Sequence, residues 1–286
     1  MQRSEVTTRV LAWYDANARD LPWRREGVGP WAVLVSEFMC QQTPVARVVE
    51  PWAAWLERWP TPAALAQAPV GDAIRQWGRL GYPRRAQRLH TTARTIVERH
   101  SGTVPADYAQ LRELPGVGDY TAAAILSFAF GQRHVVLDTN VRRVLLRLDY
   151  GEALPGASLT RAERERARRW LPDEPGRAAR WAVASMELGA RVCTAAKPRC
   201  VECPVTDSCA WLRLGRPEPE VRRKTQPYEG TDRQCRGVLL AVLRHRPSAT
   251  RDELLAAWPD PEQAEAALTS LVADGLVRAA AQGFSL

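Results

Sequence analysis

Residues 111 to 126 read LRELPGVGDYTAAAIL, with a proline and two glycines between two runs of helical periodicity. Pro115 ends the first helix, while Gly116 and Gly118 supply backbone freedom and leave amide groups uncovered. The second helix is expected to begin at Asp119 or Tyr120. Its positive dipole end and these amides would converge on one point, so the stretch predicts an αα-turn that can bind an anion.

The chain around this turn also reads as helix. From Thr7 to about residue 212 apolar side chains recur with a period near 3.6, and no segment alternates convincingly as a strand does. Clear stripes are Val10, Leu11 and Tyr14, then Leu89, Ala93, Ile96 and Val97. We therefore expect an all-α domain over residues 1–212.

A polar, proline-bearing segment follows at 213–234 and is expected to be a linker. Residues 235–286 then predict three helices, one opened by a capping box of Thr250 and Glu253, and the last ending near Gly275. Two short strands complete a pattern that resembles a winged helix. Such a segment could bind DNA, bind a protein or brace the core, and the sequence leaves these three roles open.

The charge balance favours nucleic acid as the partner. The chain has 40 Lys and Arg against 32 Asp and Glu, a formal charge of +8, and arginine is well suited to phosphate. A basic enzyme without such a partner is the alternative. No apolar run approaches the roughly 20 residues that cross a bilayer, and no signal-peptide pattern follows Met1. We expect a monomer in the cytoplasm, associated with the nucleoid and with no membrane partner.

Four of the six cysteines lie within seventeen positions in a C-x6-C-x2-C-x5-C pattern. They are Cys193, Cys200, Cys203 and Cys209. Because cytoplasmic thiols stay reduced, this clustering predicts metal ligands rather than disulfides. The spacing fits either a zinc site or a [4Fe–4S] cluster and does not decide between them. Cys40 and Cys235 are isolated and read as small hydrophobic residues.

Asp138 stands in VVLDTNVRRVLLRL, after an apolar run and before another amphipathic helix. Alone it would be read as a helix N-cap. The order of hairpin, aspartate and four-cysteine loop, however, resembles that of the helix-hairpin-helix base-excision DNA glycosylases. The resemblance implies a two-lobed all-α core over 1–212, a [4Fe–4S] cluster in the loop 193–209, and a monovalent cation at the hairpin. It also implies DNA contacts at Leu114, Gly116, Val117 and Gly118.

Tyr120 distinguishes between branches of this family. The bifunctional endonuclease III branch carries a lysine nucleophile at this point, so without that amine no Schiff base forms and strand cleavage should be weak or absent. A tyrosine here resembles both the A/G-specific adenine glycosylases, the MutY family, and a branch that removes thymine from G/T mismatches.

The segment LVSEFMCQQTPVARV at 34–48 resembles the adenine glycosylase segment with its catalytic glutamate, here Glu37. In its apolar surroundings Glu37 should have a raised pKa and donate a proton to the departing adenine; a structural glutamate paired with an arginine is the alternative. By the same resemblance, Asp138 stabilises the sugar cation, with Asn140 and Tyr120 positioning these groups. The residues expected at the base pocket or the opened duplex are Arg24, Gln41, Gln42, Thr43 and Tyr82.

The resemblance thus implies a monofunctional glycosylase that removes adenine opposite 8-oxoguanine or guanine from double-stranded DNA. The alternatives are a G/T mismatch thymine glycosylase and a non-catalytic iron–sulfur DNA-binding protein. Two features depart from the family pattern. The usual Nudix-like domain is replaced by the winged-helix-like segment, and Val183 stands where relatives often carry a polar residue. Both bear on how the bases are discriminated.

Overall fold

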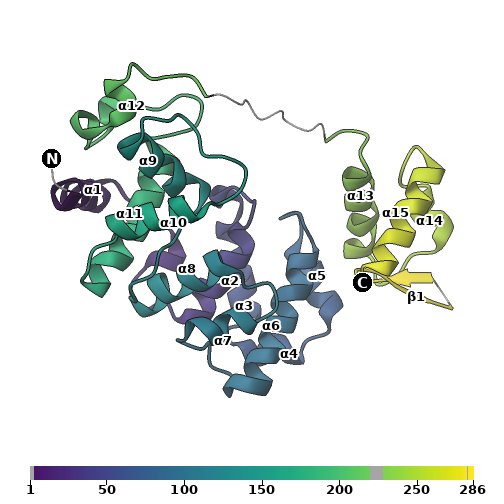
Figure 1. Ribbon diagram of the computed structural model, residues 1–286. Helices are drawn as coiled ribbons and strands as arrows, with labels where there is room; N and C mark the ends of the chain where they lie inside the picture. The colour runs from purple at the N-terminus through teal and green to yellow at the C-terminus, as the bar shows by residue number, and fades with distance from the viewer. Residues whose placement is uncertain (1–2, 220–227, 282) are drawn as a thin grey trace. The chain divides into compact units, whose positions relative to one another are not determined.

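The computed structural model describes residues 3–219, 228–281 and 283–286. Within these residues the chain is mostly helical, with one two-stranded sheet near the C-terminus (Figure 1). The expected all-α core and the small C-terminal hairpin are confirmed. None of the described helices is both long and apolar enough to cross a membrane.

The elements are α-helices, with a few short 3-10 helices between some of them. In the first half of the chain they are α1 Arg3–Asn17, η1 Pro22–Arg24, α2 Pro30–Cys40, η2 Val45–Arg47, α3 Val49–Arg58, α4 Pro62–Gln67, α5 Val70–Trp77, α6 Arg84–His100, α7 Tyr108–Glu113 and α8 Asp119–Phe130. In the second half they are α9 Thr139–Asp149, α10 Arg161–Trp170, α11 Pro175–Arg191, η3 Cys200–Glu202, η4 Thr206–Ser208, α12 Ala210–Arg213, α13 Asp232–His245, α14 Arg251–Leu255, α15 Pro261–Ala273, β1 Arg278–Ala280 and β2 Gly283–Ser285.

The described residues form two compact units. Unit 1 takes them from 1–33, 106–112 and 117–223, and unit 2 takes them from 34–105, 113–116 and 224–286. In unit 1, α11 packs against α9 and α1. Apolar residues spaced by one helical turn, such as Val6 and Val10, bury this face, and Trp170 stacks on Trp181 with ring centroids 5.9 Å apart.

Three buried tryptophans pack together in unit 2. Trp55 contacts Trp59 and Trp77 edge to face, with ring centroids 4.7 and 5.6 Å apart. Helix α6 packs against α4 and α5, burying Leu89 and Ile96 completely. The loop 78–83 between α5 and α6 is therefore anchored by a rigid core on both sides.

The C-terminal segment has the expected three helices and hairpin, with α15 packed on α13 and α14. Strands β1 and β2 pair antiparallel, and the capping box of Thr250 and Glu253 opens α14 as predicted. Both ends of the expected linker 213–234 are helical. Arg213 ends α12, and α13 already begins at Asp232 because the Thr231 side chain caps it. Part of that linker, 220–227, lies outside the described residues.

Candidate active site

Asp138 occupies the N-cap of α9, and both of its carboxylate oxygens accept hydrogen bonds. Oδ1 accepts from the backbone N–H of Val141 at 2.7 Å, and Oδ2 accepts from Nδ2 of Asn140 at 2.6 Å. The capping role expected of a lone aspartate is therefore present, but it uses only one oxygen. The second oxygen links Asp138 to a further set of side chains.

Asn140 is fixed on both sides. Nη2 of Arg143 donates to Asn140 Oδ1 at 2.8 Å, and because a guanidinium can only donate, the amide nitrogen must face Asp138. Gly189 of α11 lies directly on Asn140, where an added Cβ would stand 2.7 Å from the Asn140 Cβ. Only glycine permits this approach, so α9 and α11 together hold the Asn140 amide in place.

The ionisation of Asp138 is balanced by opposing effects. Burial raises its pKa above the ordinary aspartate value, because the charged form loses hydration. The hydrogen bonds from Val141 and Asn140, and the nearby charge of Arg143, favour the carboxylate and limit that rise. A largely desolvated carboxylate of this kind interacts strongly with a positive charge that develops nearby.

The turn at 114–118 has the expected geometry. Helix α7 ends just before it, and α8 begins at Asp119. Gly116 adopts a φ of +82°, in the left-handed region that favours glycine. Gly118 is the extended N-cap of α8, and no atom lies within 4 Å of the place where a Cβ would stand. The backbone at this helix start is therefore open to a ligand.

Leu114 and Val117, the other residues expected to contact DNA at this turn, have buried side chains. Any contact they make must come from the backbone. The Val117 carbonyl already accepts a hydrogen bond from Arg112 Nη1 at 2.7 Å, and the Pro115 carbonyl accepts one from Thr92. A cation at the hairpin therefore stays a prediction, with these two carbonyls already engaged.

Tyr120 lies in the first turn of α8 and is half-buried. It packs against a small apolar cluster that includes Ala123 and Val136, and Val136 lies two residues before Asp138. The same cluster contains Ala182 of α11, next to the partly exposed Val183. Unit 1 thus places Tyr120 on α8 and Asp138 and Asn140 at the start of α9, two helices that both pack against α11.

Glu37 lies in α2 of unit 2 with only 8% of its surface exposed. Helix α2 ends at Cys40, and the turn that follows carries Gln41, Gln42 and Thr43. Gln42 has a φ of +52°, which is unusual for a residue with a side chain. The turn is exposed at Gln42 and buried at Thr43.

Arg85 of α6 fixes this turn and the loop 78–83 in one network. The buried guanidinium donates to the carbonyls of Phe38, Met39, Gln41, Leu80 and Gly81 and to Thr43 Oγ1. Tyr82, at the tip of the loop, is 46% exposed and adopts a φ of +47°; its ring lies 5.4 Å from the Arg85 guanidinium carbon. Burial lowers the pKa of Arg85 to about 10, so the side chain remains charged at neutral pH.

Arg24 of unit 1 shares a buried carboxylate, Glu187, with a second arginine. Its Nη1 donates to Oε2 of Glu187 at 2.9 Å, and Arg19 donates to both oxygens of the same carboxylate at 2.6 and 2.8 Å. Burial by itself would raise the pKa of Glu187, but the bonds and charges of the two arginines outweigh it and hold the pKa at about 2. Glu187 is not among the site residues predicted from the sequence. A single acidic residue in the apolar helix AVASMELGA was the available signal.

The four cysteines of the loop 193–209 line one pocket. Its other walls are mainly apolar, with residues of α9, α11 and α12 such as Leu148, Leu188 and Trp211. Burial raises the pKa of the Cys203 thiol to about 11 and also raises that of Cys209. No group of three or more His, Cys, Asp or Glu in the described parts of the chain is arranged around the position of one metal ion.

Two arginines of α9 support this loop. Arg147 donates to the Cys193 sulfur at 3.3 Å and to the Thr194 carbonyl at 2.8 Å, while its guanidinium lies 4.4 Å from the Trp211 ring. Arg143, which also holds Asn140, donates to the Cys193 carbonyl at 2.6 Å. Helix α9 therefore carries the hydrogen-bond donors that hold Asp138 and also those that hold the cysteine loop.

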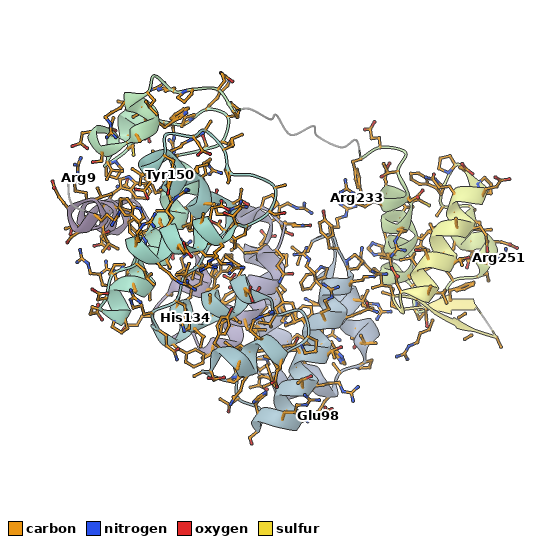
Figure 2. The ribbon with its side chains drawn as sticks, viewed as in Figure 1. Arg9, Glu98, His134, Tyr150, Arg233 and Arg251 are labelled. Atoms are coloured by element: carbon orange, nitrogen blue, oxygen red, sulfur yellow. The ribbon has the colours of Figure 1, made fainter. Side chains whose placement is uncertain are left out.

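Arg9, His134 and Tyr150, which Figure 2 labels, also make side-chain contacts in unit 1. Arg9 of α1 donates to Asp207 of the cysteine loop at 2.9 Å. His134 stacks on Tyr108 with ring centroids 5.8 Å apart, and the Arg166 guanidinium lies 3.6 Å from the Tyr150 ring.

Comparison with known proteins places these features in a family. Residues 35–169 match the HhH-GPD superfamily of base excision DNA repair proteins. An adenine DNA glycosylase of Mycobacterium tuberculosis is 51% identical over 279 residues, covering 96% of this chain and 91% of that protein. A thymine-DNA glycosylase of Aeropyrum pernix is 37% identical over 207 residues, covering 71% and 92%. The solved structure of a thermostable thymine-DNA glycosylase shares the fold, with a TM-score of 0.66 at 24% identity over 74% of this chain and 97% of that one.

Proposed function

Because the chain belongs to the HhH-GPD superfamily of base excision DNA repair proteins, we propose that it is a DNA glycosylase that hydrolyses the N-glycosidic bond of adenine mispaired with 8-oxoguanine or guanine. The observation that carries this proposal is the hydrogen-bonded Asp138 carboxylate in a chain 51% identical to an adenine DNA glycosylase. The product is an abasic site, which initiates base-excision repair. Tyr120 offers no amine, so the chain should not form a Schiff base with the sugar.

The reaction divides between two carboxyl groups. Glu37 is buried in α2 and would protonate adenine, so that the base becomes a better leaving group. As the C–N bond breaks, positive charge develops on the sugar, and the Asp138 carboxylate would stabilise it or capture it transiently. Asn140 keeps one Asp138 oxygen aligned during this step. Water then completes hydrolysis at the sugar.

Adenine is favoured over thymine as the target. Identity to the adenine DNA glycosylase is 51% over 96% of the chain, against 37% over 71% for the thymine-DNA glycosylase. A buried glutamate that donates a proton suits a purine leaving group with a basic ring nitrogen. We retain thymine in a G/T mismatch as the second substrate to be tested.

Duplex DNA is the proposed partner. The open backbone at Gly118 offers amide donors to a backbone phosphate, and the formal charge of +8 supports binding to a polyanion. Gln41, Gln42 and Tyr82 would occupy the space left when adenine leaves the stack, and Arg85 keeps both segments in place. Binding should weaken with salt at about one unit of log–log slope for each phosphate contacted.

The four cysteines fit a [4Fe–4S] cluster. Each thiolate would bind a different iron, so the four need to line one pocket without converging on one ion, and the lining observed supports this. Arg147 would donate a hydrogen bond to the Cys193 sulfur and offset part of the charge of the cluster. The cluster would supply folding energy to the loop and is not assigned a role in bond cleavage.

Two variants test the proposed chemistry. Glu37→Gln and Asp138→Asn should reduce single-turnover release of adenine opposite 8-oxoguanine by at least about a thousandfold, while binding to the same duplex is kept. Release is measured by alkaline cleavage of the abasic product, and binding by fluorescence anisotropy. Near-normal release by Glu37→Gln would refute its role as the acid.

A further inference from the structure

The C-terminal segment is attached to α6 through the end of α15. Asp274, the residue that caps α15, accepts hydrogen bonds from Arg84 at the start of α6 and from Arg236 of α13. Its side chain is only 13% exposed. One carboxylate therefore joins the winged-helix-like segment to the first residue of α6.

A second contact lies one turn further along α6. Nε2 of Gln87 donates to the carbonyls of Gly275 and Asp274 at 2.7 and 3.3 Å. Residues 84 and 87 are three apart and share one face of the helix, so both hold the same end of α15. Gly275 has a φ of +67°, which turns the chain here and presents its carbonyl to Gln87.

A third contact reaches α5. The C-terminal residue Leu286 lies so close to Gly71 that a Cβ there would stand 2.5 Å from the Leu286 carbonyl oxygen. The C-terminal segment thus contacts both helices that flank the loop 78–83. That loop carries Tyr82 with its positive φ, a conformation that persists only where surrounding contacts determine it. Arg85 and Trp77 hold the loop from the core side through the Gly81 carbonyl.

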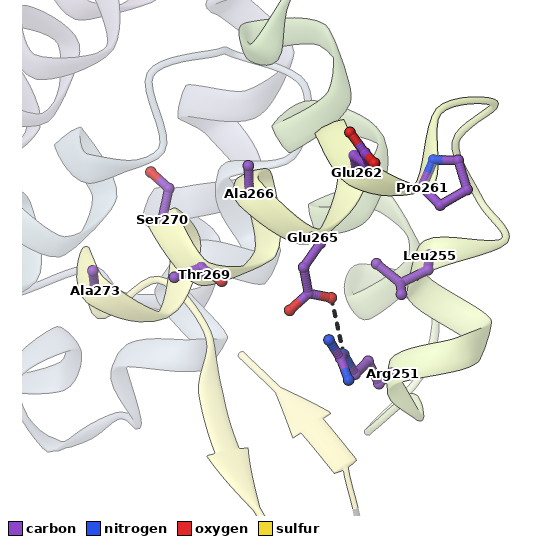
Figure 3. Close-up of a pocket in the computed structure, with 9 residues that line it drawn as sticks. All are labelled: Arg251, Leu255, Pro261, Glu262, Glu265, Ala266, Thr269, Ser270 and Ala273. Carbon is purple, nitrogen blue, oxygen red and sulfur yellow. Dashed lines mark hydrogen bonds and ion pairs between the residues drawn. The ribbon is translucent and has the colours of Figure 1, made fainter.

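The exposed face of α15, by contrast, does not suit DNA. This helix contains no Lys or Arg in its described length, and an open pocket lies along it and α14 (Figure 3). The pocket is lined mainly by apolar groups, with Glu262 and with Glu265, which pairs with Arg251 at 2.9 Å. In a winged helix the helix in this position is the one that enters the major groove, and here it carries no positively charged side chain to attract phosphate.

From these contacts we infer that the C-terminal segment is a brace for the loop 78–83, and that Asp274 is a positioning residue for Tyr82. The inference rests on the proposed function, in which Tyr82 enters the opened duplex. Asp274 itself contacts no DNA. It acts through Arg84, two residues from Tyr82, and so improves recognition of the mismatch.

The test is a double-mutant cycle in the full chain. Asp274→Asn, Tyr82→Ala and the double variant are titrated with a duplex that carries 2′-fluorinated, non-hydrolysable adenosine opposite 8-oxoguanine. Asp274→Asn should raise Kd about tenfold, as expected for losing hydrogen bonds to a charged group. In the Tyr82→Ala background the same change should have little further effect, because the side chain that Asp274 positions is gone. Equal, additive effects in both backgrounds would overturn the inference.

Two further variants complete the design. Glu265→Gln removes the same charge and an ion pair with arginine from the same segment, away from α5 and α6, and should leave Kd unchanged. Gln87→Ala breaks the contact on α6 without altering charge, and should raise Kd as Asp274→Asn does. It therefore keeps the test decisive if the Asp274→Asn protein folds poorly. If wild-type protein does not prefer the mismatched duplex over a matched one, the proposed function fails. If it does and both Asp274→Asn and Gln87→Ala bind like wild type, only the brace fails.

Discussion

Replacing Glu187 by glutamine should destabilise the folded protein at neutral pH. The carboxylate is fully buried and accepts three side-chain hydrogen bonds from Arg19 and Arg24. Its pKa is about 2 against an unperturbed value of 4.5, a difference of about 2.5 units. At about 1.36 kcal/mol per unit this corresponds to about 3 kcal/mol of unfolding free energy. Because Arg19 is 35% exposed and partly screened, about 2 to 3 kcal/mol is expected.

The effect also has a defined pH dependence. A group whose folded pKa is depressed stabilises the protein above its unfolded pKa, and this contribution is lost as the pH falls through the folded pKa. The difference between wild type and Glu187→Gln should therefore be full near pH 7 and shrink steadily between about pH 4.5 and 2.

Urea unfolding followed by circular dichroism measures both quantities. Glu165→Gln is the matched control, because Glu165 pairs with Arg161 in an exposed i, i+4 ion pair and should change stability by less than about 0.5 kcal/mol. A Glu187→Gln variant as stable as the control at pH 7, or a difference that does not shrink in acid, would refute this reasoning.

Three further changes address the active site and the cysteine loop. Arg143→Gln removes the donor that orients Asn140, so single-turnover base release should fall about tenfold while duplex binding is kept; equal rates would contradict the role of this bond. Gly189→Ala forces a Cβ to 2.7 Å from Asn140, and should lower the unfolding free energy by about 2 kcal/mol and slow base release, as thermal melts and the same assay would reveal. Cys203→Ser should abolish the visible absorption and iron content of purified protein, and retention of both would remove Cys203 from the proposed ligands.

The sequence predicts much of the architecture because the deciding signals are local. The turn at 114–118 and the helix that starts at Asp119 follow from proline and glycine chemistry over a few positions. The capping box at Thr250 is equally local. The four cysteines meet at one pocket because all of them lie within a stretch of seventeen residues. Asp138 and Asn140 are neighbours on one helical turn, so their contact also follows from spacing.

Contacts between segments that are distant in the sequence cannot be predicted from such local signals. Arg19 and Glu187 are separated by 168 positions, and nothing in either segment specifies the other as its partner. The network of Arg85 depends on carbonyl oxygens, which every residue carries, so no residue type marks the acceptors in advance. The contact of Gln87 with the end of α15 spans 188 positions and depends on how the C-terminal segment docks. Helix periodicity predicts which faces are buried but not which face meets which.

The most direct test of the account is single-turnover base release by the wild-type protein from four duplexes: adenine opposite 8-oxoguanine, adenine opposite guanine, adenine opposite thymine, and thymine opposite guanine. We expect the protein to release adenine from the first two duplexes and no base from the last two. Release of thymine opposite guanine, with adenine left intact in every duplex, would contradict this expectation and would leave Glu37 with a structural role only.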